Sequence, residues 1–272
     1  MNIPVLTYHS TNILGNEYHN NDHIAFGRDL TLIQSMDLKI LPAYQLVQWL
    51  LGKLILDPNK RYVTLTFDDG CELDYIDWKH PKFGNQNSFY TLMKDYSNFI
   101  HATSFVIASP NDRKILEQTC LEGHPIWGDA WWQHAENSGI FAIENHSWDH
   151  LHETLDNVKQ QNNEKGDFKK INTLEDASHQ ILWSANYIDS KIENKSSKLF
   201  AYPYGHFNKF LVEDFFPLNQ DKIQACFTCE PQYSNRQSNI WKIPRFVCGE
   251  NWKSIKELEY ILSGSYKSPK LS

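Results

Sequence analysis

The stretch Tyr62-Val63-Thr64-Leu65-Thr66-Phe67 is followed directly by Asp68-Asp69-Gly70. Aromatic and β-branched residues favour strands, so residues 62–67 are predicted to form a buried strand. Two adjacent carboxylates at the end of such a strand repel each other and lose solvation, and a bound cation would compensate both effects. Gly70 permits a sharp turn of the backbone. Because Asp and Gly also favour ordinary turns, this stretch alone leaves both interpretations open.

Apolar runs typical of strands alternate with helical patterns along the chain. Further strands are expected at 3–8, 103–108, 140–145, 198–202, 224–229 and 241–247. Helices are expected at 26–36, 43–54, 88–99, 112–119, 129–137, 174–192, 208–215 and 254–262. This alternation predicts an α/β fold with parallel strands in a closed or nearly closed barrel, organised as a single domain over residues 1–272. An aromatic-rich insertion of little periodicity is expected around residues 71–87.

Composition excludes several classes of protein. Hydrophobic residues make up 41% of the chain and charged residues 22%, both typical of globular proteins, and no apolar run is long enough to span a membrane. The net charge of -7 argues against nucleic acid as a partner. Five scattered cysteines favour a reducing compartment, and Cys226 and Cys229 are interpreted as strand residues. Residues 1–9 lack the features of a secretion signal, so a cytoplasmic location is expected, or a periplasmic or extracellular one if a leader has been removed.

Two more polar stretches, 144–150 and 200–205, each follow a predicted strand, and sites in such barrels lie at the carboxyl ends of the strands. His146 and His150 are four residues apart, a spacing that puts both imidazoles on one face of a helical turn. Together with Asp69 they would form an open three-ligand site for a divalent metal, most suited to zinc, although cobalt, nickel or iron would also fit. Alternatively, one histidine caps a helix and the other lies in solvent.

Three motifs in this order resemble the polysaccharide deacetylase family with its NodB-type homology domain, carbohydrate esterase family four. They are Thr66-Phe67-Asp68-Asp69-Gly70, His146-Ser147-Trp148-Asp149-His150 and Tyr202-Pro203-Tyr204-Gly205. The opening Leu6-Thr7-Tyr8-His9-Ser10 resembles the branch that acts on poly-N-acetylglucosamine-like polymers. The resemblance covers residues 3–250 and implies a distorted (β/α) barrel of about seven strands. It also implies a metal-dependent hydrolase that removes acetyl groups from N-acetylated carbohydrate.

The resemblance further implies a role for each motif residue. Asp68 would act as general base, and Asp69, His146 and His150 would bind the metal. The backbone N–H of Tyr204 would donate to the oxyanion. These roles form a coherent mechanism, because a metal activates water, a carboxylate removes its proton and an N–H group stabilises the developing charge.

The sequence departs from the family pattern at two places. The arginine expected two residues before Pro203 is replaced by Ala201, and we predict that Arg245 reaches Asp68 instead; the alternative is a surface or packing arginine. The Leu-x-x-His motif that supplies the general acid is also missing. His9 is the first candidate for this role, with His206 and His152 as further candidates. The alternative for His9 is a structural histidine or an additional metal or substrate contact.

Two other functions stay open at this point: a barrel that binds glycan without hydrolysing it, and a hydrolase of another non-peptide C–N bond. Several aromatic residues are candidates for a sugar-binding groove, although burial in the core is the stronger expectation for most of them. They are Tyr75, Trp78, Trp127, Trp131, Trp132 and Trp148. Three acidic residues, Asp74, Asp77 and Asp149, are expected to be solvated or to lie behind the metal ligands.

Overall fold

The computed structural model describes residues 1–96, 99–193 and 195–267. Strand β3 (Tyr62–Asp68) lies inside a parallel sheet, between β1 (Val5–His9) and β6 (Ala102–Val106). Among the described residues the strands follow the order β10-β1-β3-β6-β7-β8-β9, and β2 pairs with the start of β3. The remaining bounds are β2 (Lys39–Ile40), β7 (Phe141–Asn145), β8 (Leu199–Ala201), β9 (Ala225–Phe227) and β10 (Phe246–Val247). The predicted α/β barrel, curled and incompletely closed, is confirmed.

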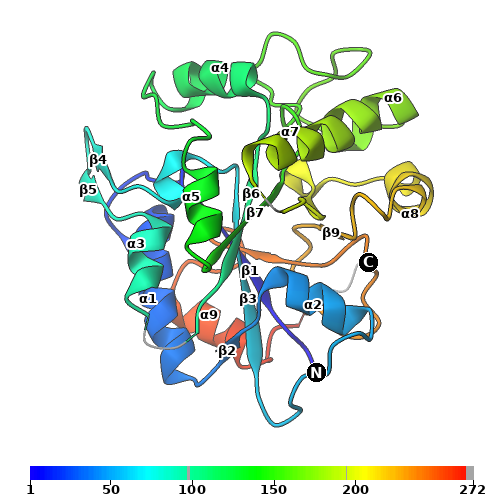
Figure 1. Ribbon diagram of the computed structural model, residues 1–272. Coiled ribbons are helices and arrows are strands. Elements are labelled where there is room, and N and C mark those ends of the chain that lie inside the picture. Colours follow the sequence, from blue (N-terminus) through cyan, green and yellow to red (C-terminus); the bar gives the residue numbers. More distant parts are fainter. Residues whose placement is uncertain (97–98, 194, 268–272) are drawn as a thin grey trace.

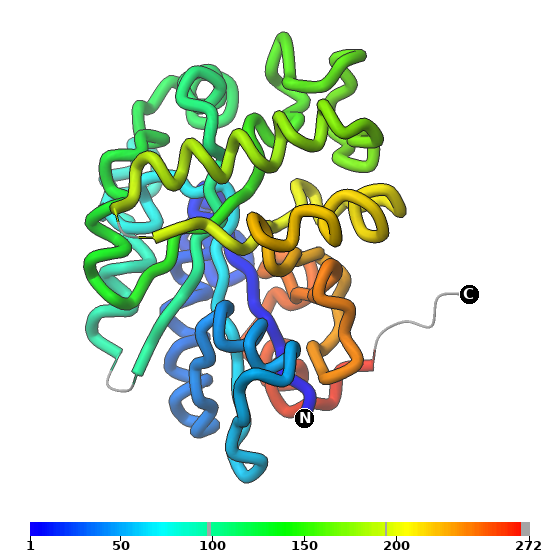
Figure 2. The backbone as a smooth tube through the Cα atoms, turned by 45° about the vertical axis from the view of Figure 1, so that its right-hand side comes forward, coloured from blue at the N-terminus to red at the C-terminus, as the bar shows by residue number. Residues whose placement is uncertain are grey.

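Helices surround the curled sheet, as Figures 1 and 2 show. They are α1 (Asp22–Ser35), α2 (Ala43–Leu50), α3 (Phe89–Lys94), α4 (Pro110–Cys120), α5 (Trp132–Asn137), α6 (Leu174–Ala177), α7 (Trp183–Lys191), α8 (Phe216–Leu218) and α9 (Ile255–Leu262). Short 3-10 turns are η1 (Tyr18–Asn20), η2 (Glu72–Asp74), η3 (Phe168–Lys170) and η5 (Pro203–Gly205), and π-helical segments are η4 (Ser178–Leu182) and η6 (Phe210–Phe215). No described helix has the length and apolar character needed to cross a bilayer.

The two faces of β3 have different environments because side chains alternate along a strand. Val63, Leu65 and Phe67 pack in the core shared with α1, α3 and α9. Thr66 and Asp68 lie on the opposite face, where both contact Arg245 inside the barrel. The alternation therefore directs Asp68 into the barrel at the carboxyl end of its strand.

Several expected elements differ from the structure. The strand expected over 241–247 is limited to Phe246–Val247, and the helix expected over 174–192 is interrupted by the π-helical segment η4. The helix expected over 43–54 ends at Leu50, and the one expected over 88–99 ends at Lys94, with residues 97 and 98 of that prediction lying outside the described residues. The insertion around 71–87 is more regular than expected. It contains an antiparallel hairpin of β4 (Trp78–His80) and β5 (Gly84–Gln86). These strands are three residues long and only Gln86 in them is buried, so they carry no apolar alternation to reveal them.

Candidate active site

A cavity of about 280 Å³ lies where the predicted polar stretches meet, and we call it the site cavity. Six of the predicted site residues line it: His9, Asp68, Asp69, His146, His150 and Tyr204. They come from the ends of β1 and β3 and from the segments that follow β7 and β8. The parallel topology brings these segments together because the carboxyl ends of parallel strands lie at one edge.

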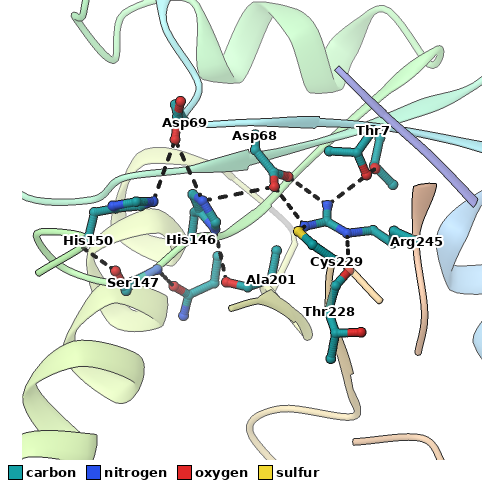
Figure 3. A network of polar contacts seen from close by, with 12 residues as sticks. Thr7, Asp68, Asp69, His146, Ser147, His150, Ala201, Thr228, Cys229 and Arg245 are labelled. Carbon is teal, nitrogen blue, oxygen red and sulfur yellow. Dashed lines mark hydrogen bonds and ion pairs between the residues drawn. The ribbon is translucent and has the colours of Figure 1, made fainter. Parts of the chain in front are cut away.

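Asp69, His146 and His150 form a group in which one ligand atom from each residue lies within 4.8 Å of the others. The Oδ1 atom of Asp69 is 3.6 Å from Nε2 of His146 and 3.8 Å from Nε2 of His150 (Figure 3). Two donors held about 2.1 Å from one tetrahedral ion lie roughly 3.4 Å apart. The donor set therefore fits a single divalent ion with little movement.

Hydrogen bonding and burial prepare the two imidazoles to bind a metal. His146 Nδ1 lies 2.9 Å from the carbonyl oxygen of Ala201, which can only accept, so this nitrogen carries the proton and Nε2 offers its lone pair toward Asp69. Burial lowers the pKa of His146 and, with the neighbouring histidines, holds the pKa of His150 well below its usual value. Both rings are therefore neutral at neutral pH, which is the metal-binding form.

The two histidines do not meet through helical spacing, and that expectation is wrong. Residues 146–150 form a loop, in which Ser147 and His150 have φ angles of 73° and 64°. The loop lies against the segment after β6, where Ala108 N donates to Ser147 O at 3.0 Å. The Ser147 hydroxyl accepts a hydrogen bond of 2.9 Å from His150 N. A turn of the backbone, rather than a helix face, brings the imidazoles together.

Left-handed backbone conformations gather around the cavity. Asp69, His150 and Tyr204 have φ angles of 73°, 64° and 58°. Such angles are uncommon for residues other than glycine and cost about 1–3 kcal/mol each. They persist where surrounding structure fixes them, and they cluster at functional sites.

Asp68 is held by Arg245, which is fully buried, so a surface position for this arginine is wrong. Nη1 and Nη2 of Arg245 donate to the two carboxylate oxygens of Asp68, each at 2.7 Å, and Nε donates to Thr228 O at 2.9 Å (Figure 3). Burial alone would raise the pKa of Asp68, but the guanidinium outweighs it and lowers the pKa to about 2. Asp68 is therefore ionised at neutral pH. Ala201 meanwhile contributes its carbonyl to His146.

Two of the three general-acid candidates, His9 and His152, line the site cavity. The backbone N–H of His9 donates to Asp22 Oδ2 at 2.8 Å, which fixes the end of β1. Burial by itself lowers the pKa of His9, but the carboxylates of Asp69 and Asp68 outweigh it and raise the pKa. His206 is not among the residues that line the cavity, and its Nδ1 lies 3.0 Å from Asp167 Oδ1.

Most of the candidate groove aromatics are core residues. Trp127, Trp131 and Trp132 are 4%, 2% and 0% exposed. Trp127 also lines the site cavity, where its Nε1 donates to Asp69 O at 3.1 Å. Tyr75 and Trp148 are half-buried and pack on the main core. Among these aromatics, Trp78 is the one that lines a second cavity, next to the hairpin.

Of the two alternatives expected for these carboxylates, solvation is excluded for Asp74 and Asp149, both of which are fully buried. Asp74 Oδ2 accepts a hydrogen bond of 2.5 Å from Ser104. Asp149 accepts from Leu151 N at 2.9 Å and from Gln180 Nε2 at 2.7 Å, so it ties the histidine loop to η4. Its place between two ligand candidates was the available signal in the sequence, since buried carboxylates need such partners.

Comparisons with known proteins cover nearly the whole chain. A family model described as Polysaccharide deacetylase matches residues 56–215, more than half of the sequence. No curated protein sequence matches the chain.

Three solved structures illustrate the structural likeness. The structure of IcaB from Ammonifex degensii has a TM-score of 0.66 and 17% identity, over 97% of this chain and 97% of that one. The structure of the Streptococcus pyogenes deacetylase PplD in complex with acetate has a TM-score of 0.63 and 18% identity, over 98% of this chain and 99% of that one. The structure of a de-N-acetylase from Aggregatibacter actinomycetemcomitans has a TM-score of 0.64 and 16% identity, over 95% of this chain and 99% of that one. At these identities the likeness establishes a shared fold.

Proposed function

Because the chain belongs to the polysaccharide deacetylase family, we propose that it is a metal-dependent hydrolase that removes acetyl groups from the N-acetylated sugars of a polysaccharide or oligosaccharide. The observation that carries the proposal is that a candidate metal group and a separate carboxylate lie side by side in one cavity. The candidate metal group is Asp69, His146 and His150, and the separate carboxylate is that of Asp68. His146 Nε2 lies 4.0 Å from Asp68 Oδ2, so the metal group and the carboxylate adjoin.

Asp69, His146 and His150 would hold the divalent ion. Two imidazole nitrogens and one carboxylate oxygen suit zinc best, while cobalt, nickel and iron accept the same donors. When bound, such an ion lowers the pKa of a coordinated water and polarises the acetamide carbonyl.

Asp68 would remove the proton of the attacking water. A general base must be unprotonated, and the low pKa of Asp68 meets this requirement at neutral pH. Arg245 fixes both carboxylate oxygens, so it acts as a positioning residue that does not itself touch the substrate. This contact supports the view that Arg245 takes over the task of the missing motif arginine.

Two further groups would act after the attack of water: one would stabilise the oxyanion, and the other would protonate the leaving amine. The Tyr204 N–H, in a left-handed turn at the cavity, is the proposed donor to the oxyanion of the tetrahedral intermediate. His9 is the proposed acid that protonates the leaving amine. Its raised pKa favours the protonated ring that an acid needs.

Acetate release from N-acetylglucosamine oligomers, measured together with the metal content of the protein, tests the proposal. We expect bound metal, released acetate, and a loss of at least about 100-fold in kcat for Asp68→Asn. Asp156→Asn is the matched control, because Asp156 is an exposed carboxylate on a nearby loop and should leave kcat unchanged. Bound metal and bound oligomer without acetate would instead identify a glycan-binding barrel, and release of another acid from an amide substrate would identify a different C–N hydrolase.

A further inference from the structure

A second cavity of about 260 Å³ lies between the β4–β5 hairpin and the segment after α4, and we call it the hairpin cavity. The residues that line it include Trp78, His80 and Phe83 of the hairpin segment and His124 of the segment after α4. Ring centroids are 4.9 Å apart for Trp78 and His80, 4.7 Å for His80 and Phe83, and 5.3 Å for Trp78 and His124. These aromatic rings form a cluster that is half-buried rather than sealed in the core.

The hairpin is fixed to the rest of the barrel, so the cavity has defined walls. Phe83 O accepts hydrogen bonds from Asn16 Nδ2 at 3.0 Å and from Gln86 Nε2 at 3.1 Å. Gln86 Oε1 accepts from Asn21 Nδ2 at 2.8 Å, which connects the hairpin to the start of α1. Hydrogen bonds from a separate part of the chain hold the hairpin in place.

The charges around the hairpin cavity are balanced. Among the described residues that line it, the acidic and basic side chains are Glu122 and Lys82, which form an ion pair at 2.5 Å. No unpaired charge is left among these lining residues to attract an anionic or cationic ligand. The hydroxyl group of Thr11 and the imidazole of His80 provide polar contacts beside the aromatic rings, whereas the Ser10 hydroxyl is buried and lies 3.2 Å from Cys71 Sγ. Aromatic faces combined with a few neutral polar groups suit the apolar face and hydroxyls of an uncharged sugar ring.

The hairpin cavity adjoins the site cavity through three segments of the chain. His9 lines the site cavity and the next residue, Ser10, lines the hairpin cavity. Likewise, Trp127 lines the site cavity and Ile126 lines the hairpin cavity. Asp69 lines the first, and the nearby Cys71 lines the second. Neighbouring residues of these three segments therefore line both cavities, which places the hairpin cavity beside the site cavity.

We propose that the hairpin cavity is a second sugar subsite, which binds an uncharged N-acetylglucosamine-type unit next to the one that is deacetylated and so selects oligomers over monomers. This inference rests on the proposed function. Stacking of a sugar on Trp78 supplies most of the selectivity, because flat aromatic contacts are individually the strongest in the cavity.

The test compares the N-acetylglucosamine monomer and tetramer, in acetate release and in binding measured by tryptophan fluorescence. For Trp78→Ala we expect the tetramer-to-monomer ratio of kcat/KM to fall about tenfold, and tetramer binding to weaken by the same factor, which corresponds to roughly 1.4 kcal/mol. Trp78→Phe keeps an aromatic face and should restore most of the ratio. Tyr260→Ala, an exposed aromatic on α9 outside both cavities, should leave the ratio unchanged. Thermal melting of each variant separates a lost subsite from a disordered hairpin.

The outcomes separate this inference from the proposed function. If acetate is released and Trp78→Ala and Phe83→Ala both keep the wild-type ratio, the subsite is wrong and the deacetylase proposal stands. If no acetate is released but the tetramer binds and Trp78→Ala weakens that binding, the subsite stands and the deacetylase proposal fails. If the tetramer neither binds nor reacts, both are overturned.

Discussion

Arg245 and Asp68 are 177 positions apart in the sequence, yet they form a bidentate ion pair that is almost completely removed from solvent. A buried carboxylate is stable only with such a partner, because desolvation of a lone charge costs several kcal/mol. The absence of an arginine at position 201, together with an arginine at the end of the last predicted strand, made this contact predictable from the sequence. Its bidentate geometry was not predictable, since that depends on Thr228 and Thr66 around the guanidinium.

Replacing Arg245 by alanine should affect both stability and the pH dependence of turnover. Removing one partner leaves the Asp68 charge buried and unpaired, so we expect a loss of roughly 3–5 kcal/mol in the free energy of unfolding. The pKa of Asp68 then rises, and the acidic limb of the kcat/KM profile moves to higher pH because the base must be ionised. Denaturant unfolding and a pH–rate profile measure the two effects, with the exposed Arg28→Ala as control.

A double variant sharpens this prediction. Asp68→Asn in the Arg245→Ala background removes the unpaired charge and should return part of the lost stability but none of the activity. In the wild-type protein the pKa of Asp68 is about 2 when folded and about 3.9 when unfolded, so the pair stabilises the fold above about pH 4 and this contribution is lost as the pH falls toward 2. An unchanged pH–rate profile in Arg245→Ala would contradict the positioning role.

At the scale of the element, the turn after β3 depends on a close approach to β6. Gly70 has a φ angle of 69°, and a Cβ atom there would overlap Cγ1 of Val106. Gly139 offers a matched comparison, with a φ angle of 73° and no atom within 4 Å of the point where a Cβ atom would lie. A residue with a Cβ atom is therefore disfavoured at position 139 by the backbone conformation alone. At position 70 it is disfavoured by the backbone conformation and also by the contact with Val106.

Replacing each of these two glycines by alanine should separate the cost of a left-handed backbone from the cost of the contact with Val106. Gly139→Ala should lower the free energy of unfolding by about 1–2 kcal/mol, the cost of a left-handed alanine. Gly70→Ala should cost more and should also weaken metal binding, because the turn that carries Asp69 must move away from Val106. Denaturant unfolding and zinc titration measure both. Equal losses of stability in the two variants, with zinc affinity intact in Gly70→Ala, would show that the contact with Val106 is unimportant.

The loop that carries the two histidines depends on Asp149. Its carboxylate accepts hydrogen bonds from Leu151 N and Gln180 Nε2, next to the candidate ligand His150. Outer contacts of this kind typically change metal affinity by about 10–100-fold, and we expect a loss in this range for Asp149→Ala. Isothermal titration with zinc measures it. Asp156→Ala, an exposed carboxylate in the same loop region, should bind zinc like the wild type, and a wild-type affinity in Asp149→Ala would rule out this role.

The sequence predicted the strands and helices better than it predicted the turns and loops that connect them. The strand at 62–67 and the strand at 140–145 are in place because they are apolar, continuous and bounded by polar residues. The hairpin at 78–86 was not predicted because its strands are short and only one of their residues, Gln86, is buried. The histidine loop was assigned the wrong local geometry, since a four-residue spacing also occurs in a turn with left-handed residues. Such turns are set by contacts with distant segments, which no local pattern contains.

At the scale of the whole molecule, the candidate metal group joins parts of the chain that are far apart. Asp69 follows β3 and the two histidines follow β7, and β6 lies between these strands in the sheet. Motif order along the sequence indicated which residues meet, because parallel strands bring their carboxyl ends to one edge. The distances between them follow from the curl of the sheet, which the sequence alone does not give.

An ion held by these segments should stabilise the entire fold, because it binds only when β3 and β7 are correctly arranged. At a free zinc concentration of 100 times Kd the gain is about 2.7 kcal/mol, which for a chain of this size corresponds to a rise in Tm of roughly 5 °C. Asp69→Asn and His150→Ala should each abolish most of this rise, whereas His19→Ala, an exposed histidine outside the group, should keep it. Thermal melting with zinc and with a chelator measures the difference. If Asp69→Asn retained the full zinc-dependent rise, the ion would be bound elsewhere, and the three residues would have to share the cavity for another reason.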